Sequence, residues 1–348
     1  MEKYSKWRDF GTGIQPFLPL TPPNIRKTAV NKIKDLIVVY FAGVAFSITR
    51  LLIISAIFSL DIAFLNLLYF LAPTKYIFNS IQTAIRRVTA SLVLFISGFY
   101  QITQNVYSVK KIKQSKHKAV EKSKVPKSGD LILSNHSSYI DVLYFISKYN
   151  PVFVEIDNAT LYMKPLKGWS AIASSCSKPT ALLNAKHAQS LKSICEEARN
   201  YNLGPVVIFP ENTTTNGQAL LQLLPIFSNF ENIDEKSNIF ITSIKYPSKE
   251  FSPTFPMGNP FSHFFWLNSR FYNQIIVTNV DAADCPKFFY DSSSKSGNAV
   301  SPALDNINID KEINSTLISC SKLRQTKLTA LDKLEFLNYY QNKSKQYK

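Results

Sequence analysis

The residues best suited to chemistry are a histidine and an aspartate that follow a short apolar run, Leu131–Leu133. Four residues separate His136 from Asp141. Positions i and i+5 of one helix point apart, so we expect His136 in the turn after a strand and Asp141 in the first turn of the next helix. From there the Asp141 carboxylate can accept a hydrogen bond from one ring nitrogen, which leaves the other free to act as a general base. The alternative is a surface histidine beside a helix-starting aspartate.

A second polar turn follows another apolar run, Val206–Phe209, which also predicts a strand. The turn carries Glu211 and two threonines. With the two motifs in this order, the chain resembles the PlsC-like superfamily of glycerolipid acyltransferases, whose signatures are N-H-x-x-x-x-D and F-P-E-G-T. The matching residues are Asn135, His136 and Asp141, and then Phe209, Pro210, Glu211, Asn212 and Thr213.

Two further stretches carry resemblances. The start of the chain, from Trp7 to Phe17, resembles the fungal lysophosphatidic acid:oleoyl-CoA acyltransferases, and the T-T-T-N-G continuation after Asn212 resembles the lysophospholipid acyltransferase branch. Together the resemblances cover roughly residues 1–20 and 85–280. They imply an α/β, PlsC-like glycerol-phosphate acyltransferase fold with an N-terminal membrane-embedded helical segment.

The resemblance implies acyl transfer from acyl-CoA, as co-substrate, to the hydroxyl of a lysophospholipid, without an acyl-enzyme. His136 would take the hydroxyl proton, and Asp141 would fix the ring tautomer and stabilise the imidazolium. It implies neither a cofactor nor a metal, and the four cysteines are too widely spaced for a zinc site. The residues expected to bind substrate are Asn135, Phe209, Pro210, Glu211, Asn212, Thr213 and Thr214.

Three departures from the family pattern concern the acceptor. Asn212 replaces the usual glycine, and asparagine tolerates the left-handed backbone that glycine provides. Thr214 replaces an arginine, and around Lys178–Lys186 only lysines stand where an arginine block is expected. Lysine lacks the bidentate fork of arginine. The first expected acceptor is lysophosphatidic acid, which gives phosphatidic acid in glycerolipid and triacylglycerol synthesis. One alternative is an acyltransferase that acts on another lysophospholipid. The other is that the protein is a non-catalytic membrane or lipid-droplet adaptor.

The composition favours a membrane partner. The 348 residues hold 40 lysines and arginines against 24 acidic residues, a formal charge of +16, which suits nucleic acid or an anionic membrane surface. No basic patch with interleaved aromatics and no nucleic-acid reader motif appears, so nucleic acid is not an expected partner. The hydrophobic content of 45% favours a bilayer or lipid-droplet surface.

The chain divides by pattern. Residues 36–72 are too long for one perpendicular span and predict either a hairpin or a span with an interfacial extension. From Tyr76 an apolar stripe in steps of three and four predicts an amphipathic helix on the membrane or on the domain. Strand-like and helical runs then alternate, which predicts an α/β fold. The expected parts are a basic arm at 1–35, the membrane segment at 36–72, the amphipathic helix at 76–107, the acyltransferase domain at 110–280, a flexible loop at 281–310 and a basic helix and tail at 311–348.

The expected strands are Leu131–Leu133, Val152–Ile156, Thr180–Leu183, Val206–Phe209, Ile239–Ile244 and Ile275–Val277, and Ala188–Asn200 is the clearest expected helix. Both signature motifs contain a formal glycosylation acceptor, at Asn135 and Asn212. A glycan at either would obstruct the site. We therefore expect the catalytic face in the cytosol. The possible hairpin and the fungal resemblance imply endoplasmic reticulum membrane and lipid droplets as the location.

Overall fold

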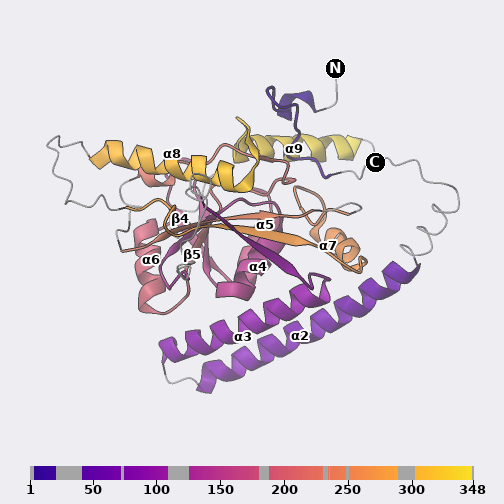
Figure 1. Cartoon of the computed structure of the whole chain (residues 1–348). Coiled ribbons are helices and arrows are strands. Elements are labelled where there is room, and N and C mark those ends of the chain that lie inside the picture. The colour runs from indigo at the N-terminus through magenta and orange to yellow at the C-terminus, as the bar shows by residue number, and fades with distance from the viewer. Residues whose placement is uncertain are drawn as a thin grey trace, which may run out of the picture.

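A mixed seven-stranded sheet forms the centre of the molecule (Figure 1). The computed structural model describes residues 4–20, 41–71, 74–108, 125–179, 188–229, 234, 236–247, 251–288 and 302–346. The strand order is β1-β8-β7-β2-β5-β3-β4. The strands are β1 (Ile102–Tyr107), β2 (Leu131–Ser134), β3 (Val152–Ile156), β4 (Met163–Lys167), β5 (Val206–Ile208), β7 (Ile239–Lys245) and β8 (Ile275–Val280), and a separate pair joins β6 (Ala219–Leu220) to β9 (Arg324–Gln325).

Helices cover both faces of this sheet. Residues of one strand alternate in direction, so Ile132 faces one core and its neighbours Leu131 and Leu133 face the other. The first core packs on α2, α3, α4 and α5, and the second on α6 and α8. The helices are α2 (Gly43–Leu71), α3 (Lys75–Ile96), α4 (Tyr139–Tyr149), α5 (Trp169–Cys176), α6 (Leu191–Asn200), α7 (Pro260–Asn268), α8 (Pro302–Ser321) and α9 (Ala330–Gln346), with short 3-10 turns η1 (Ser5–Trp7) and η5 (Ile226–Ser228).

The expected α/β fold is confirmed. Five of the six expected strands are present, and the sixth, Thr180–Leu183, lies outside the described residues. The expected helix at Ala188–Asn200 begins later, at Leu191, because the Ser190 side chain caps it by accepting from the Ser193 amide at 3.4 Å. Strands β1 and β4 were not expected, since both lie at sheet edges and carry polar residues.

The apolar segment expected as a hairpin or a span is a continuous helix from Gly43 to Leu71. No turn interrupts it, because no glycine or proline follows Gly43 before Pro73. Instead α2 and α3 lie side by side below the sheet in Figure 1. The Thr89 hydroxyl of α3 donates to Asp61 of α2 at 3.1 Å. Among the described helices, α2 is the one long and apolar enough to cross a membrane, over Gly43–Tyr69.

The prediction of an amphipathic helix over 76–107 is correct as far as Ile96 and wrong over residues 97–107. Helix α3 ends at Ile96, and Gly98 turns the chain with a φ of +90°. A Cβ at this glycine would lie 3.0 Å from the carbonyl oxygen of Phe271, so other residues are strongly disfavoured there. The chain then enters β1, which pairs in parallel with β8. The central sheet therefore begins at Ile102, before the expected domain start at residue 110.

The two ends of the chain also differ from expectation. Residues 302–310, expected in a loop, are the first half of α8, and the expected single C-terminal helix is two helices separated at Lys322, whose φ is +51°. The N-terminal arm, expected as a basic arm over 1–35, packs on α9 in its described part, residues 4–20. Trp7 and Phe17 are buried against Phe336 of that helix. Residues 21–35 and 289–301 lie outside the described residues.

Candidate active site

The sheet topology brings the two polar motifs together. Strands β7, β2 and β5 are neighbours and run parallel, with Leu133 of β2 beside Ile208 of β5 and Ile241 of β7. The carboxyl ends of parallel strands meet at one sheet edge, where functional loops of α/β proteins gather. Hence His136 leaves β2 beside the Glu211 turn that leaves β5.

His136 and Asp141 form the expected pair. The imidazole Nδ1 lies 3.0 Å from Asp141 Oδ2, with His136 in the turn after β2 and Asp141 in the first turn of α4. Both side chains are buried, and the imidazole stacks on the Phe209 ring with 4.0 Å between ring centroids. A carboxylate only accepts hydrogen bonds, so Nδ1 carries the proton in the neutral ring and Nε2 is left as the basic nitrogen.

The Asp141 carboxylate is held by three more donors. Its Oδ2 accepts from the backbone amides of Ser137 at 2.7 Å and Ser138 at 2.8 Å, and Oδ1 accepts from the Tyr246 hydroxyl at 2.5 Å. Ser138 and Asp141 form a capping box at the start of α4. Tyr246, which sequence reasoning missed, follows β7 at the same sheet edge. The carboxylate that orients His136 is thus itself fixed from three sides.

Asn135 fixes the backbone just before the histidine. Its amide nitrogen donates to the Ile244 carbonyl at 2.9 Å, and its amide oxygen accepts from the Ile244 amide at 2.8 Å. The Thr215 amide donates to the His136 carbonyl at 3.0 Å. The Asn135 side chain is buried, and both of its polar groups bond the backbone of β7. This geometry supports a positioning role.

Glu211 lies behind the pocket wall. Its Oε1 accepts from the His136 amide at 2.9 Å, and its Oε2 accepts from the Leu221 amide at 2.9 Å. Burial raises the pKa of the Glu211 carboxyl to about 8, which the two backbone donors only partly offset. Its neighbour Pro210 is also buried, and the Pro210 carbonyl accepts from Leu224. These contacts join the two signature motifs directly.

Asn212 adopts the left-handed backbone expected of it, with a φ of +52°. Its side chain also bonds β3: the amide nitrogen donates to the Ile156 carbonyl at 2.8 Å, and the amide oxygen accepts from the Ile156 amide at 3.2 Å. Glycine could not make these two bonds. The substitution therefore keeps the turn and ties it to the sheet.

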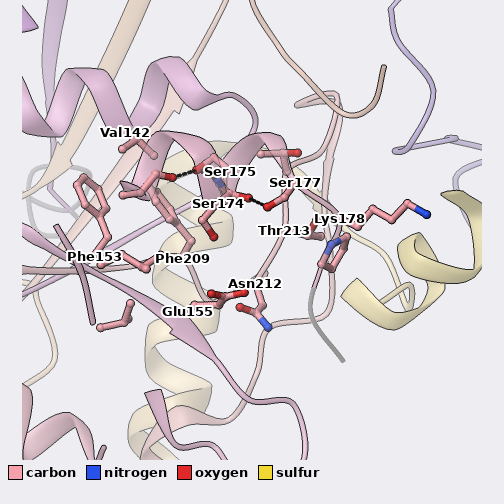
Figure 2. Close-up of a pocket in the computed structure, with 16 residues that line it drawn as sticks. Val142, Phe153, Glu155, Ser174, Ser175, Ser177, Lys178, Phe209, Asn212 and Thr213 are labelled. Carbon is pink, nitrogen blue, oxygen red and sulfur yellow. Dashed lines mark hydrogen bonds between the residues drawn. The ribbon is translucent and has the colours of Figure 1, made fainter. Parts of the chain in front are cut away.

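A pocket opens beside the histidine (Figure 2). Phe153, Phe209 and Leu166 give it an apolar side, and polar groups of α5 and of the Asn212 turn give it a polar side. Five of the nine expected site residues line it, while Asn135, Asp141, Pro210 and Glu211 stand behind it. Those five are His136, Phe209, Asn212, Thr213 and Thr214.

The comparisons with known proteins agree with this geometry. A family model described as Acyltransferase matches residues 109–243. A Schizosaccharomyces pombe protein, provisionally named a lysophosphatidic acid:oleoyl-CoA acyltransferase, is 30% identical over 247 residues, covering 71% of this chain and 73% of that protein. The chain belongs to the acyltransferase family.

Two more distant likenesses accompany that match. A lysophospholipid acyltransferase of Arabidopsis thaliana is 25% identical over 218 residues, 55% of this chain and 50% of that protein. The 1-acyl-sn-glycerophosphate acyltransferase PlsC of Thermotoga maritima matches at 13% identity with a TM-score of 0.40, over 84% of this chain and 96% of that one.

One pocket residue of this acyltransferase escaped sequence reasoning. Ser175, near the end of α5, places its hydroxyl 3.2 Å from His136 Nε2 and 2.9 Å from the Ala171 carbonyl. The hydroxyl proton can serve only one of these two acceptors at a time. The oxygen stands where the hydroxyl of an acceptor would need to stand for His136 to take its proton.

One of the two expected lysines lies at the pocket. Lys178 lines the pocket, but its ammonium donates to Asn338 at 3.0 Å and Gln341 at 2.7 Å of α9, away from the pocket centre. The other expected lysine, Lys186, lies outside the described residues. Within the described ranges, no three metal-ligating side chains gather into a metal site.

Proposed function

We propose that this acyltransferase transfers the acyl group of acyl-CoA to the hydroxyl of lysophosphatidic acid, giving phosphatidic acid and free CoA. The observation that carries the proposal is the His136–Asp141 pair, whose basic nitrogen reaches a half-apolar pocket. Intact His136 and Asp141, in a chain of this family, favour an enzyme over a non-catalytic adaptor.

In the proposed step, the acceptor hydroxyl displaces the Ser175 hydroxyl from His136 Nε2. His136 removes the hydroxyl proton as the oxygen forms a bond to the thioester carbonyl carbon. The carbon–sulfur bond then breaks, and the CoA thiolate leaves with the proton that the imidazolium returns. Asp141 stabilises the imidazolium between these two events.

The developing oxyanion requires preorganised donors at the pocket wall. The Asn212 amide is already bonded to the Phe209 carbonyl at 2.8 Å. Thr213 and Thr214 follow it and line the pocket, so their backbone amides are the proposed donors. The apolar side formed by Phe153 and Leu166 suits the first carbons of an acyl chain.

Helices α2 and α3 support membrane association. Arg50 and Asp61, the two charges of α2, are buried against the protein: Arg50 donates to the carbonyls of Asn268, Arg270 and Phe271, and Asp61 accepts from Thr89 and Trp169. The charges therefore do not face lipid. The outward side is apolar and exposed, through Leu52, Leu60, Ile62, Phe64 and Leu67 of α2 and Ile77, Ile81, Val88, Leu92 and Phe95 of α3.

We infer that the α2–α3 pair enters one leaflet and keeps the pocket at the membrane surface. A helix bonded to the domain at two points about 17 Å apart along its axis is poorly placed to cross the bilayer alone. Endoplasmic reticulum membrane and the monolayer of lipid droplets, with the site in the cytosol, are the proposed locations.

A panel of lysolipids tests the acceptor. With oleoyl-CoA and membranes that contain the wild-type chain, we expect lysophosphatidate to be acylated at least about tenfold faster than lysophosphatidylcholine or lysophosphatidylethanolamine, because a recognised phosphate monoester contributes over 1.4 kcal/mol. The single pocket lysine among the described residues and the Arabidopsis relative favour the second candidate, another lysophospholipid. A faster rate with a zwitterionic lysolipid would establish that alternative.

A further inference from the structure

A fully buried lysine reaches the signature turn from the far end of the chain. Lys333 lies in the first turn of α9 and is 1% exposed. Its ammonium donates to the Thr214 carbonyl at 2.7 Å and to the Thr214 hydroxyl at 2.8 Å. These bonds join residues 119 positions apart.

The segment that precedes Lys333 is bonded to the backbone at β6, which follows the signature turn. The Thr326 amide donates to the Leu220 carbonyl at 2.8 Å, and the Gln222 amide donates to the Leu328 carbonyl at 2.8 Å. Leu221, between these two, donates its own amide to Glu211. The backbone that follows the turn is thus bonded to the segment that leads into α9, and Lys333 lies in the first turn of that helix.

Burying an ammonium group costs free energy unless hydrogen bonds or an opposite charge compensate it. Burial lowers the pKa of Lys333 to about 7, against the opposing attraction of Glu211. A methionine of similar length would fill the same volume without desolvating a charge. What it would lack is the pair of bonds to Thr214, a residue that lines the pocket beside His136.

We propose that Lys333 is a positioning residue for acyl transfer, which fixes the Thr213–Thr214 backbone at the pocket wall through its two bonds to Thr214. The inference rests on the proposed function, because that backbone supplies the proposed oxyanion donors. It also assigns α9 a part in the active site, although α9 lies outside the stretch that the family model matches.

Lys333→Met tests this role, with Lys6→Met as the matched control. Lys6 forms an ion pair at 2.8 Å with Glu335, which lies in α9 as Lys333 does. Both side chains of this pair are exposed, so loss of the ion pair should leave the rate unchanged. For Lys333→Met we expect kcat to fall by about tenfold or more with KM for oleoyl-CoA within about threefold, the pattern of an interaction made in the transition state. A purely structural lysine would lower the amount of folded enzyme and leave kcat per folded molecule unchanged.

Two further measurements keep the test decisive. Thr214→Val removes the hydroxyl acceptor while leaving Lys333 in place, and the double variant should lose less than the product of the two single losses. Hydrogen exchange across Phe209–Gly217 should speed up by about tenfold in Lys333→Met whatever the acceptor lipid proves to be. Unchanged exchange together with unchanged kcat, or fully independent losses in the double variant, would overturn the proposal. An inactive wild type with faster exchange in Lys333→Met would instead count against the proposed function alone.

Discussion

Replacing His136 with alanine should lower the rate of acyl transfer from oleoyl-CoA to lysophosphatidate by at least about 100-fold, the lower end of what a positioned general base contributes. The variant keeps Asp141 and the pocket walls but removes the basic nitrogen that takes the hydroxyl proton. Initial rates at saturating oleoyl-CoA, normalised to the abundance of each protein, measure the effect.

Ser175→Ala is the control for this first prediction. Ser175 lies 3.2 Å from His136 Nε2, so serine, histidine and aspartate together resemble a hydrolase triad. In direct transfer the Ser175 hydroxyl only occupies the acceptor position, and its removal should change the rate by less than about tenfold. A loss as large as that of His136→Ala, together with an acyl group trapped on Ser175, would replace direct transfer by an acyl-enzyme mechanism.

Glu211→Ala should lower both stability and rate. The His136 and Leu221 amides that Glu211 accepts would be left buried without a partner, at about 1–3 kcal/mol each. We expect the free energy of unfolding to fall by about 2–4 kcal/mol, and kcat to fall by about tenfold or more because the backbone that carries the base is released. Denaturant titration and steady-state kinetics measure the two effects separately.

Glu211→Gln separates positioning from substrate binding. Burial raises the pKa of the Glu211 carboxyl to about 8, and glutamine matches the carboxyl in shape, but its single amide oxygen can accept from only one of the His136 and Leu221 amides. If Glu211 acts by positioning, we expect glutamine to recover part of the stability lost in Glu211→Ala, with KM for both substrates within about threefold of wild type. A large rise in KM for lysophosphatidate at normal stability would instead support direct contact between Glu211 and the acceptor.

The meeting of the two motifs follows from the chain itself. Each motif is an apolar strand that ends in a polar turn, and parallel strands of one sheet end at the same edge, so His136 and the Glu211 turn are expected to be neighbours. The left-handed backbone of Asn212 was expected because asparagine, which tolerates that conformation, replaces the glycine of the family signature. That feature depends on a few consecutive residues, whereas the meeting of the two motifs also requires β2 to pair with β5.

Tyr246 and Lys333, which hold the site residues in place, could not be predicted from the residues next to them in the sequence. Tyr246 reaches Asp141 from 105 positions away, and Lys333 reaches Thr214 from 119. A lysine in an amphipathic, basic stretch predicts an exposed side chain, and only the packing of α9 on the turn buries Lys333. Likewise Arg50 and Asp61 interrupt an apolar run in the sequence, and only the docked helix shows that both face the protein.

The end of α3 was predicted wrongly for a similar reason. The apolar steps continue through Phe99 and Ile102, so the stripe gives no sign of its end. Gly98 ends the helix, and Phe99 remains buried because the chain turns back into the same core. Hydrophobic spacing marks one apolar face of α3, most of which is exposed, and it does not show where the helix ends, because a single glycine decides that.

Acyl transfer by Asp141→Asn, measured beside wild type with oleoyl-CoA and lysophosphatidate at equal protein abundance, tests the central claim most directly. Asparagine has the size of aspartate and can still accept from Ser137 and Ser138, so the fold is kept while the negative charge behind His136 is removed. We predict that phosphatidate formation falls by at least about 100-fold. Equal rates in the two proteins would contradict the assignment of His136 and Asp141 as the acid–base pair.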